Sequence, residues 1–348
     1  MSLAAGRLTD AEALRLLQHG DLLELGYRAD EVRRRLHPGD DVTFVVDRNI
    51  NYTNVCISGC RFCAFYREAG SPDAYVLSED EIYAKIEETL ALGGTAVMMQ
   101  GGLHPDLRVE WFERLFAGIK QRYPIHIHSL SPPEVAHIAE LSHIGIPETL
   151  QRLRTAGLDS LPGGGAEVLV DRVRSAISPH KIPTDVWLDV MRQAHILGMK
   201  TTATMMFGSL DAPQDRVEHL RRIRDLQDET GGFTAFIPWT FQAGNTQLQA
   251  GHTPSTGIDY LRMLAAGRLY LDNVPNIQAS WVTQGIKLGQ VSLTFGANDM
   301  GSTMIEENVV RAAGVSHKVS VEQMVGAIRA AGRTPVQRDT LYRPLRRY

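Results

Sequence analysis

Short apolar runs alternate with amphipathic helical segments along most of this chain of 348 residues. Many of the runs are rich in β-branched residues, which favour strands. Eight of them are expected to be strands: residues 42–55, 95–100, 126–131, 157–162, 200–208, 233–241, 276–282 and 291–297. Strands that are apolar on both faces and alternate with helices predict an α/β fold with a covered parallel sheet. Eight such units favour a (β/α)8 barrel of the TIM type, with a doubly wound open sheet as the alternative.

Capping signals predict helices beyond both ends of this barrel. Thr9 and Glu12 form a capping-box pattern before an apolar helix face, and a second helix is expected at about residues 30–36. Thr303 and Glu306 repeat the pattern and predict a last helix. No linker or low-complexity stretch interrupts the sequence, so we expect one domain. Its parts are N-terminal helices (1–41), a barrel (42–300), and C-terminal helices with a tail (301–348).

Composition and charge exclude some classes of partner. The net charge of -4 gives no reason to expect nucleic acid or an anionic membrane surface as partner. Arginines near the end of the chain are expected to form a solvated basic tail: Arg333, Arg338, Arg343, Arg346 and Arg347. No apolar run approaches the ~20 residues of a membrane-spanning helix, and the N-terminus lacks the pattern of a signal peptide. We therefore expect a cytoplasmic protein with reduced thiols.

All three cysteines of the chain, Cys56, Cys60 and Cys63, lie in one C-x3-C-x2-C segment. Three thiolates in one loop can hold a compact site for a soft metal. A closed zinc site needs four ligands, and His126 or His128 could supply the fourth. Unreactive structural cysteines are a second alternative. An iron–sulfur cluster is favoured, because three protein thiolates leave one iron free to bind a substrate or cofactor.

The cysteine motif after the first strand, with Phe62 before the third cysteine, resembles the radical S-adenosylmethionine (SAM) superfamily. The resemblance implies that the three cysteines hold a 4Fe–4S cluster and that SAM chelates its open iron. It also implies that SAM contacts Phe62 and the glycine pair that follows the second strand, Gly101 and Gly102. Glycines allow close approach of the backbone to a ligand in any case.

One departure from the superfamily pattern concerns SAM binding. A glutamate commonly follows the two glycines, and this chain has Leu103 there. Gln100 and backbone carbonyl groups are our candidates to bind the SAM amino group instead. Thr204, in the segment TTATMMFG, is a further candidate for the cofactor site.

Several other segments resemble the cyclic dehypoxanthinylfutalosine synthase family of the futalosine route to menaquinone. They are NYTNVCISGCRFCAFYR, QGGLHPDL, LPGGGAEVLVDRVR, TTATMMFG, PWTFQAGNT and GANDMGSTMIEENVVRAAG. The resemblance implies that a 5′-deoxyadenosyl radical removes hydrogen from the ribose C4′ of dehypoxanthine futalosine. The sugar radical then closes onto the benzoate ring. It further implies a small-molecule substrate and an electron donor such as flavodoxin or ferredoxin.

Polar residues near the expected strand ends are the candidates for this chemistry, because barrel enzymes place function there. The candidates for acid–base work are His104, His128, Glu167, Asp171 and Asp299. Candidates for substrate binding are Arg172, Asn298 and Glu307, and the guanidinium of Arg172 or Arg174 suits a benzoate carboxylate. Two alternatives stay open: a relative such as aminofutalosine synthase or the deazaflavin (F0) enzymes, and a non-enzymatic iron–sulfur or zinc protein.

Overall fold

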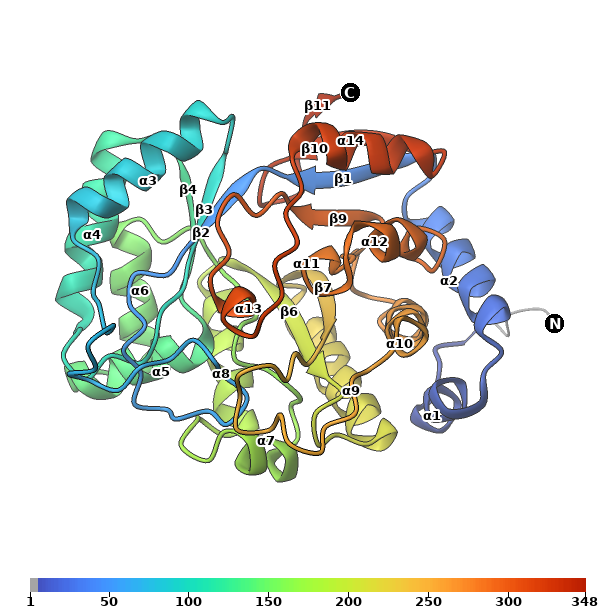
Figure 1. The fold of residues 1–348 in the computed structure, drawn as a ribbon, viewed down its shortest axis with the longest axis horizontal. Helices are drawn as coiled ribbons and strands as arrows, with labels where there is room; N and C mark the ends of the chain where they lie inside the picture. Colours follow the sequence, from blue (N-terminus) through green and yellow to red (C-terminus); the bar gives the residue numbers. More distant parts are fainter. Residues whose placement is uncertain (1–5) are drawn as a thin grey trace.

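The computed structural model describes residues 6–348 and has the architecture of a curled α/β barrel (Figure 1). Within these residues, seven parallel strands form one sheet in the order β2-β3-β4-β5-β6-β7-β8. They are β2 (Asp47–Ile50), β3 (Ala96–Met99), β4 (His126–Ser129), β5 (Ser160–Leu161), β6 (Lys200–Phe207), β7 (Phe233–Thr240) and β8 (Asn276–Ile277). Spatial order follows chain order, as in TIM-type barrels. The expected barrel class is confirmed.

Two further strands complete the ring of pairings. β1 (Asp41–Val45) runs almost directly into β2, and β9 (Asp299–Ser302) pairs with β1 in parallel. Gln278, which follows β8, forms a bridge to Asp299, and the Ala279 amide donates to the Asp299 carbonyl at 2.8 Å. Pairing therefore runs from β2 to β8, then to β9 and back to β1, so the barrel encloses a space.

The prediction of a strand at residues 291–297 is wrong. Ile286–Ser292 form helix α12, and the strand of this unit is β9 instead. The buried residues of α12 are Gly289 and Ser292, three positions apart, which is the spacing of one helix face and not of a strand. Leu293, Phe295 and Ala297 are buried as well, in the turn and loop between α12 and β9. Short apolar runs are ambiguous between these two structures, and here tertiary packing decides for the helix.

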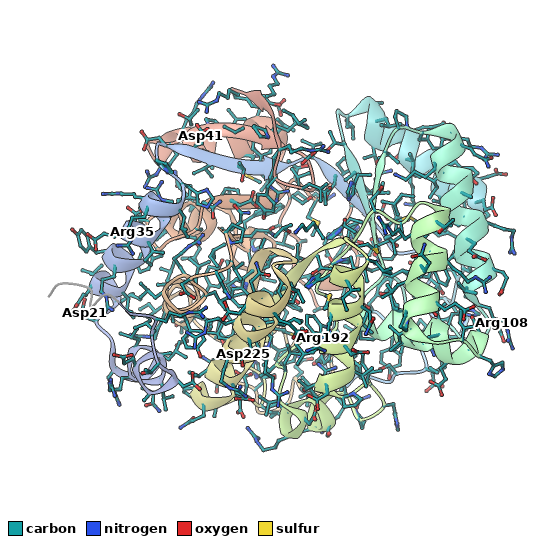
Figure 2. The ribbon with its side chains drawn as sticks, turned by 180° about the vertical axis from the view of Figure 1, so that it is seen from behind. Asp21, Arg35, Asp41, Arg108, Arg192 and Asp225 are labelled. Carbon is teal, nitrogen blue, oxygen red and sulfur yellow. The ribbon has the colours of Figure 1, made fainter. Side chains whose placement is uncertain are left out.

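Helices surround the sheet, and charged side chains such as Arg192 and Asp225 lie on their outer faces (Figure 2). The covering helices are α3 (Glu79–Ala91), α4 (Val109–Arg122), α5 (Pro132–Ser142), α6 (Ile146–Ala156), α7 (Asp171–Ile177), α8 (Thr184–Ile196), α9 (Pro213–Thr230), α10 (Gly257–Tyr270) and α11 (Trp281–Gln284). Their inner faces bury large side chains against the strands; Trp187 of α8, for example, stacks on Phe233 of β7. Within the part of the chain that the structure describes, no helix is both long and apolar enough to cross a membrane.

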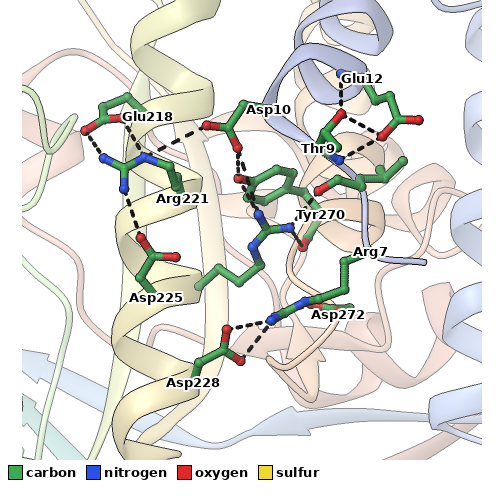
Figure 3. Close-up of polar contacts among 12 residues, drawn as sticks. Arg7, Thr9, Asp10, Glu12, Glu218, Arg221, Asp225, Asp228, Tyr270 and Asp272 are labelled. Atoms are coloured by element: carbon green, nitrogen blue, oxygen red, sulfur yellow. Dashed lines mark hydrogen bonds and ion pairs between the residues drawn. The ribbon is translucent and has the colours of Figure 1, made fainter.

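The N-terminal helices α1 (Asp10–His19) and α2 (Leu22–Leu36) pack on α9 and α10. The capping box expected at Thr9 and Glu12 is present. Arg7 joins α9 to the turn after α10, because its guanidinium lies 2.6 Å from Asp228 and 2.7 Å from Asp272 (Figure 3). The second helix begins at Leu22, well before the expected residue 30.

The C-terminal segment differs from the expected helices and solvated tail. It contains α13 (Val309–Ala312), α14 (Val321–Ala330), β10 (Thr334–Arg338) and β11 (Pro344–Arg347). The prediction of a helix that begins at Thr303 and Glu306 is wrong. The Thr303 amide donates a hydrogen bond to the Val45 carbonyl, and Glu306 pairs with Lys85. β10 adds to β1 in parallel. Arg338 is only 4% exposed, so the basic tail is not uniformly solvated.

Candidate functional site

The cysteine loop follows β2 and lies against the loop that follows β3. The Ile57 amide donates to the Leu103 carbonyl at 3.1 Å, and the Cys56 amide donates to the Arg67 carbonyl at 3.0 Å. Cys60 is buried, and the Cys63 amide donates to its carbonyl at 3.1 Å. The three thiols therefore sit in an ordered loop at the carboxyl end of a barrel strand, where this fold places its active sites.

The donor set of this loop fits an iron–sulfur cluster. All three cysteines are free thiols, and in residues 6–348 no three His, Cys, Asp or Glu side chains converge closely enough to hold one metal ion. A 4Fe–4S cluster does not need such convergence, because each thiolate binds a different iron. Burial raises the pKa of the Cys56 and Cys63 thiols, and iron would stabilise their thiolates.

Gly101 and Gly102 are required by packing against the cysteine loop. A Cβ atom on Gly102 would lie 2.1 Å from the Val55 carbonyl oxygen and 2.7 Å from the Cys56 Cβ. A Cβ atom on Gly101 would lie 2.7 Å from the ring of Tyr52. The glycine pair therefore lets the β3 loop approach the backbone that carries Cys56.

Gly102→Ala is expected to displace the cysteine loop and to lower the iron content of the reconstituted protein severalfold. The clash is with a backbone carbonyl, which cannot move without shifting Cys56. Iron and sulfide analysis after reconstitution measures the effect. Gly326→Ala in α14 is the matched control, since its Cβ meets nothing within 4 Å. Equal iron content in the two variants would contradict this packing role.

A buried carboxylate that sequence reasoning missed supports the glycine loop. Glu134 is 3% exposed and accepts hydrogen bonds from the Tyr52 hydroxyl at 2.6 Å and the Gly101 amide at 2.9 Å. Burial raises the pKa of its carboxyl group. Glu134 and Leu103 line the same small cavity. The signal was the S-x-x-E capping box that begins at Ser131.

A cavity of about 220 Å³ lies inside the barrel and brings several expected site residues together. Four of them line it: Gln100, His128, Glu167 and Thr204. It also contains polar residues that the sequence analysis did not assign: Asp47, Gln278, Arg338, Thr340 and Tyr342. Met98, Ile237 and Trp239 supply apolar wall, so the space combines apolar surface with a few polar groups, as small-molecule sites do.

A chain of contacts joins this cavity to the cysteine loop. The Lys181 ammonium lies 2.8 Å from the Glu167 carboxylate and 4.9 Å from the centroid of the Phe62 ring. Arg174 adds a second cation, 3.4 Å from the same carboxylate. Glu167 adopts a φ of 42°, which is uncommon for a residue with a Cβ atom. Phe62 is therefore separated from the cavity wall by one ion pair.

His128 lines the cavity as a neutral imidazole. Its Nδ1 lies 2.7 Å from the Ser160 hydroxyl, and His126 Nε2 lies 2.7 Å from the same oxygen. This shared contact agrees with the alternation of strand residues, which predicts one face for the two histidines. Burial lowers the pKa of His128 to about 3, so it is a weak base at neutral pH.

Asp299 is buried beside the cavity as the partner of Arg338. Arg338 Nε lies 2.6 Å and Nη2 2.9 Å from the two carboxylate oxygens. Thr43 and the Gly301 amide donate to the same carboxylate. These contacts satisfy Asp299, which weighs against its expected role as a free base. The Asp47 carboxylate accepts fewer hydrogen bonds than that of Asp299. The Ser302 hydroxyl donates to it, and burial raises the pKa of Asp47 to about 6.

Three expected residues lie away from the cavity with partners of their own. The Arg172 side chain is 62% exposed and pairs with Asp215. Asp171 accepts the Thr184 amide at 2.8 Å. Glu307 accepts backbone amides at the start of α13, among them that of Val310. None of these contacts leads to the interior, so the geometry gives these residues no support as site groups.

Asn298 and His104 have structural contacts as well. Asn298 accepts hydrogen bonds from Arg268 at 2.7 Å and from the Ile277 amide at 3.0 Å, which fixes the β8–β9 junction. His104 accepts the Asp106 amide at 3.1 Å and lines the small cavity near Glu134. His104 is near the glycine loop but does not line the larger cavity.

Two family models match the chain. The model of the radical SAM superfamily matches residues 50–223, and the model of the CofH/MqnC C-terminal region matches residues 230–347. The second match spans β7 to β11 and thus includes Arg338 and Tyr342. Both the cysteine loop and the C-terminal wall of the cavity therefore fall within known family regions.

Curated relatives match over nearly the whole chain. The cyclic dehypoxanthine futalosine synthase of Streptomyces coelicolor is 48% identical, with 98% of this chain and 86% of the relative covered. The enzyme of the same name from Halalkalibacterium halodurans is 46% identical, with 98% and 92% covered. A 5-amino-6-(D-ribitylamino)uracil–L-tyrosine 4-hydroxyphenyl transferase from Methanopyrus kandleri is 44% identical, with 99% and 95% covered.

Solved structures agree on the fold. The chain superposes on methylornithine synthase (PylB) with a TM-score of 0.75 at 20% identity, covering 95% of both chains. It superposes on the hydrogenase maturase HydG from Carboxydothermus hydrogenoformans with a TM-score of 0.75 at 15% identity, covering 97% of this chain and 78% of that one. With the cysteine loop, the interior cavity and these matches together, the chain belongs to the radical SAM superfamily, whose enzymes bind a 4Fe–4S cluster and SAM, in the group with the CofH/MqnC C-terminal region.

Proposed function

We propose that this protein is a radical SAM cyclase that converts dehypoxanthine futalosine to cyclic dehypoxanthinylfutalosine in menaquinone biosynthesis. The observation that carries the proposal is the 48% identity, over 98% of this chain, to a relative with the corresponding name. The geometry supports it, because the barrel strands surround the cavity, and the Lys181–Glu167 ion pair joins the cavity wall to Phe62 of the cysteine loop. Such an enclosure keeps water and other hydrogen donors away from a reactive intermediate.

Cys56, Cys60 and Cys63 would hold the cluster, and the bound cluster with SAM would supply the 5′-deoxyadenosyl radical. Gly101 and Gly102 would position the β3 loop beside SAM, since their packing fixes that loop against Cys56. Gln100, Glu167 and Thr204 line the cavity and are our candidates for polar contacts with cofactor or substrate. His128 would act as a neutral hydrogen-bonding group.

An anaerobic assay tests the proposed function. The protein is reconstituted with iron and sulfide, reduced, and supplied with SAM and dehypoxanthine futalosine. We expect 5′-deoxyadenosine and a product two hydrogens lighter than the substrate, detected by mass spectrometry. If none of the tested substrates leads to formation of 5′-deoxyadenosine, the radical SAM activity itself is refuted.

The same assay separates the cyclase from its relatives. A parallel reaction contains L-tyrosine and 5-amino-6-(D-ribitylamino)uracil, the compounds in the name of the 44% identical transferase. Turnover of this pair without cyclisation of dehypoxanthine futalosine would replace the cyclase proposal with the deazaflavin-type alternative. Product from dehypoxanthine futalosine alone would support the cyclase.

The proposed reaction needs an electron donor and a reducing compartment. We assign the first role to a small electron carrier such as flavodoxin or ferredoxin, which would reduce the cluster. We assign the protein to the cytoplasm, because thiols that must bind iron stay reduced there. Turnover with reduced flavodoxin or ferredoxin in place of a chemical reductant tests the donor.

A further inference from the structure

The C-terminal segment closes one end of the barrel with polar groups. Arg338 ends β10, and Thr340 and Tyr342 follow it; all three line the cavity. Because β10 pairs with β1 in parallel, these residues lie near the start of β2, where Asp47 also lines the cavity. We call Asp47, Arg338, Thr340 and Tyr342 the barrel floor.

The barrel floor lies at the opposite end of β2 from the cysteine loop. Asp47 begins β2, and Cys56 comes after its end at Ile50. Three residue steps of a strand span roughly 10 Å. Figure 1 shows the same separation, with the loop after β2 in the lower part of the view and β10 at the top. A molecule that reaches from one end to the other must be elongated.

Two hydroxyl groups of the barrel floor lack partners. The Thr340 Oγ1 and the Tyr342 phenolic oxygen are shielded from solvent, and neither has a hydrogen-bond partner among residues 6–348. A buried polar group without a partner is costly, so such a group needs explanation in a folded protein. Tyr342 also adopts a φ of 65°, a left-handed conformation that is uncommon for a tyrosine.

The surroundings of these hydroxyls favour an acceptor with negative charge. The Arg338 guanidinium lies 3.8 Å from the centroid of the Tyr342 ring. Its Nε and Nη2 bind Asp299 and its Nη1 donates to the Asp339 carbonyl at 3.0 Å, so each nitrogen already has one partner. Burial raises the pKa of Tyr342, so its hydroxyl stays protonated and can donate. A carboxylate accepts several such hydrogen bonds at once.

Asp47 is the acidic group of the barrel floor, and its repulsion of an anion decreases when it is protonated. Burial raises the pKa of Asp47 to about 6, and a second negative charge nearby raises it further. A protonated Asp47 can itself donate a hydrogen bond.

We propose that Thr340 and Tyr342 bind the benzoate carboxylate of the substrate at the barrel floor, with the sugar directed toward the cysteine loop. The inference rests on the proposed function. It requires a substrate with the benzoate carboxylate at one end and the ribose C4′, which loses hydrogen, nearer the other end. It assigns recognition of the aromatic acid to the C-terminal segment. Neither hydroxyl belongs to the region that matches the radical SAM model.

Tyr342→Phe tests the assignment in the reconstituted full-length protein. The ring and its contact with Arg338 remain, and only the hydroxyl is lost. We expect the KM for dehypoxanthine futalosine to rise about tenfold or more, as for loss of a hydrogen bond to a charged group. Thr340→Val should act in the same direction. The melting temperature without substrate should not fall, because the removed hydroxyl has no partner to lose.

Tyr348→Phe is the matched control. It removes a tyrosine hydroxyl from the same segment, but this hydroxyl donates to Gln337 at 3.0 Å and Tyr348 does not line the cavity. Its KM should equal that of the unmodified protein. A carboxamide analogue of the substrate provides the second arm: Tyr342→Phe should weaken its binding less than it weakens binding of the carboxylate.

The outcomes separate the two proposals. If the unmodified protein cyclises the substrate and Tyr342→Phe keeps its KM, the carboxylate assignment is overturned while the function stands. Equal weakening for the carboxylate and the carboxamide would also overturn it, because recognition would then not depend on charge. If the unmodified protein yields no cyclised product, the proposed function itself fails.

Discussion

Replacing Cys56, Cys60 or Cys63 by alanine is expected to reduce formation of 5′-deoxyadenosine to the background of the uncatalysed reaction. Each thiolate would bind a different iron, and the chain has no other cysteine to replace it. Loss of one ligand should therefore leave an incomplete or unstable cluster. Iron and sulfide content, the visible absorbance of the reconstituted protein, and 5′-deoxyadenosine formation by chromatography measure the effect.

A structural explanation for such a loss must be excluded. Cys60 is buried, so alanine leaves a small cavity, whereas Cys56 and Cys63 are partly exposed and should tolerate alanine well. Ser58→Ala is the control, because Ser58 lies in the same loop with its hydroxyl 3.2 Å from the Cys60 sulfur. Ser58→Ala should keep the cluster. A cysteine variant that keeps both its cluster and its activity would refute the assignment of that cysteine.

The sequence predicted most of the barrel because its strands are distinct apolar runs. The runs around Met98, Met205 and Phe236 have turn signals on both sides, and each is a strand in the structure. Residues 291–297 were misleading, because a short apolar run fits a buried helix equally well. The strand of the last barrel unit, β9, contains Asp299 and Gly301 and has little apolar character, so the pattern did not reveal it.

The candidate site was predictable only where the signal is local. Three cysteines within one loop are recognisable from spacing, and the structure places that loop after β2, at the carboxyl end of a barrel strand. Contacts made across the fold have no local signal. Arg338 meets Asp299 from 39 residues away, and a charge-rich tail is usually solvated. The long-range pairing of β10 with β1 brings Arg338 and Tyr342 into the cavity, and sequence periodicity does not encode it.

Arg338→Met is expected to lower the free energy of unfolding by about 3–5 kcal/mol, because it leaves a buried carboxylate without its partner. The Asp299 side chain is 0% exposed and the Arg338 side chain 5%, and the two form a pair of hydrogen bonds. The effect should appear as a lower midpoint in chemical denaturation. Arg347→Met is the control. Arg347 lies in the same C-terminal segment as Arg338 and pairs with Asp41 of β1, but its side chain is 68% exposed. Exposed pairs contribute at most about 1 kcal/mol.

A double variant shows whether the cost comes from the unpaired charge. Asp299→Asn removes the negative charge, so Arg338→Met with Asp299→Asn should be more stable than Arg338→Met alone. Such non-additivity is expected for residues in direct contact. If Arg338→Met is no less stable than Arg347→Met, the buried ion pair does not hold the C-terminal segment in place. If the double variant regains stability, the loss in Arg338→Met comes from the unpaired charge of Asp299. The barrel floor is then stable because the charges of Arg338 and Asp299 neutralise each other. That neutralisation is the condition under which its free hydroxyls can bind an anion.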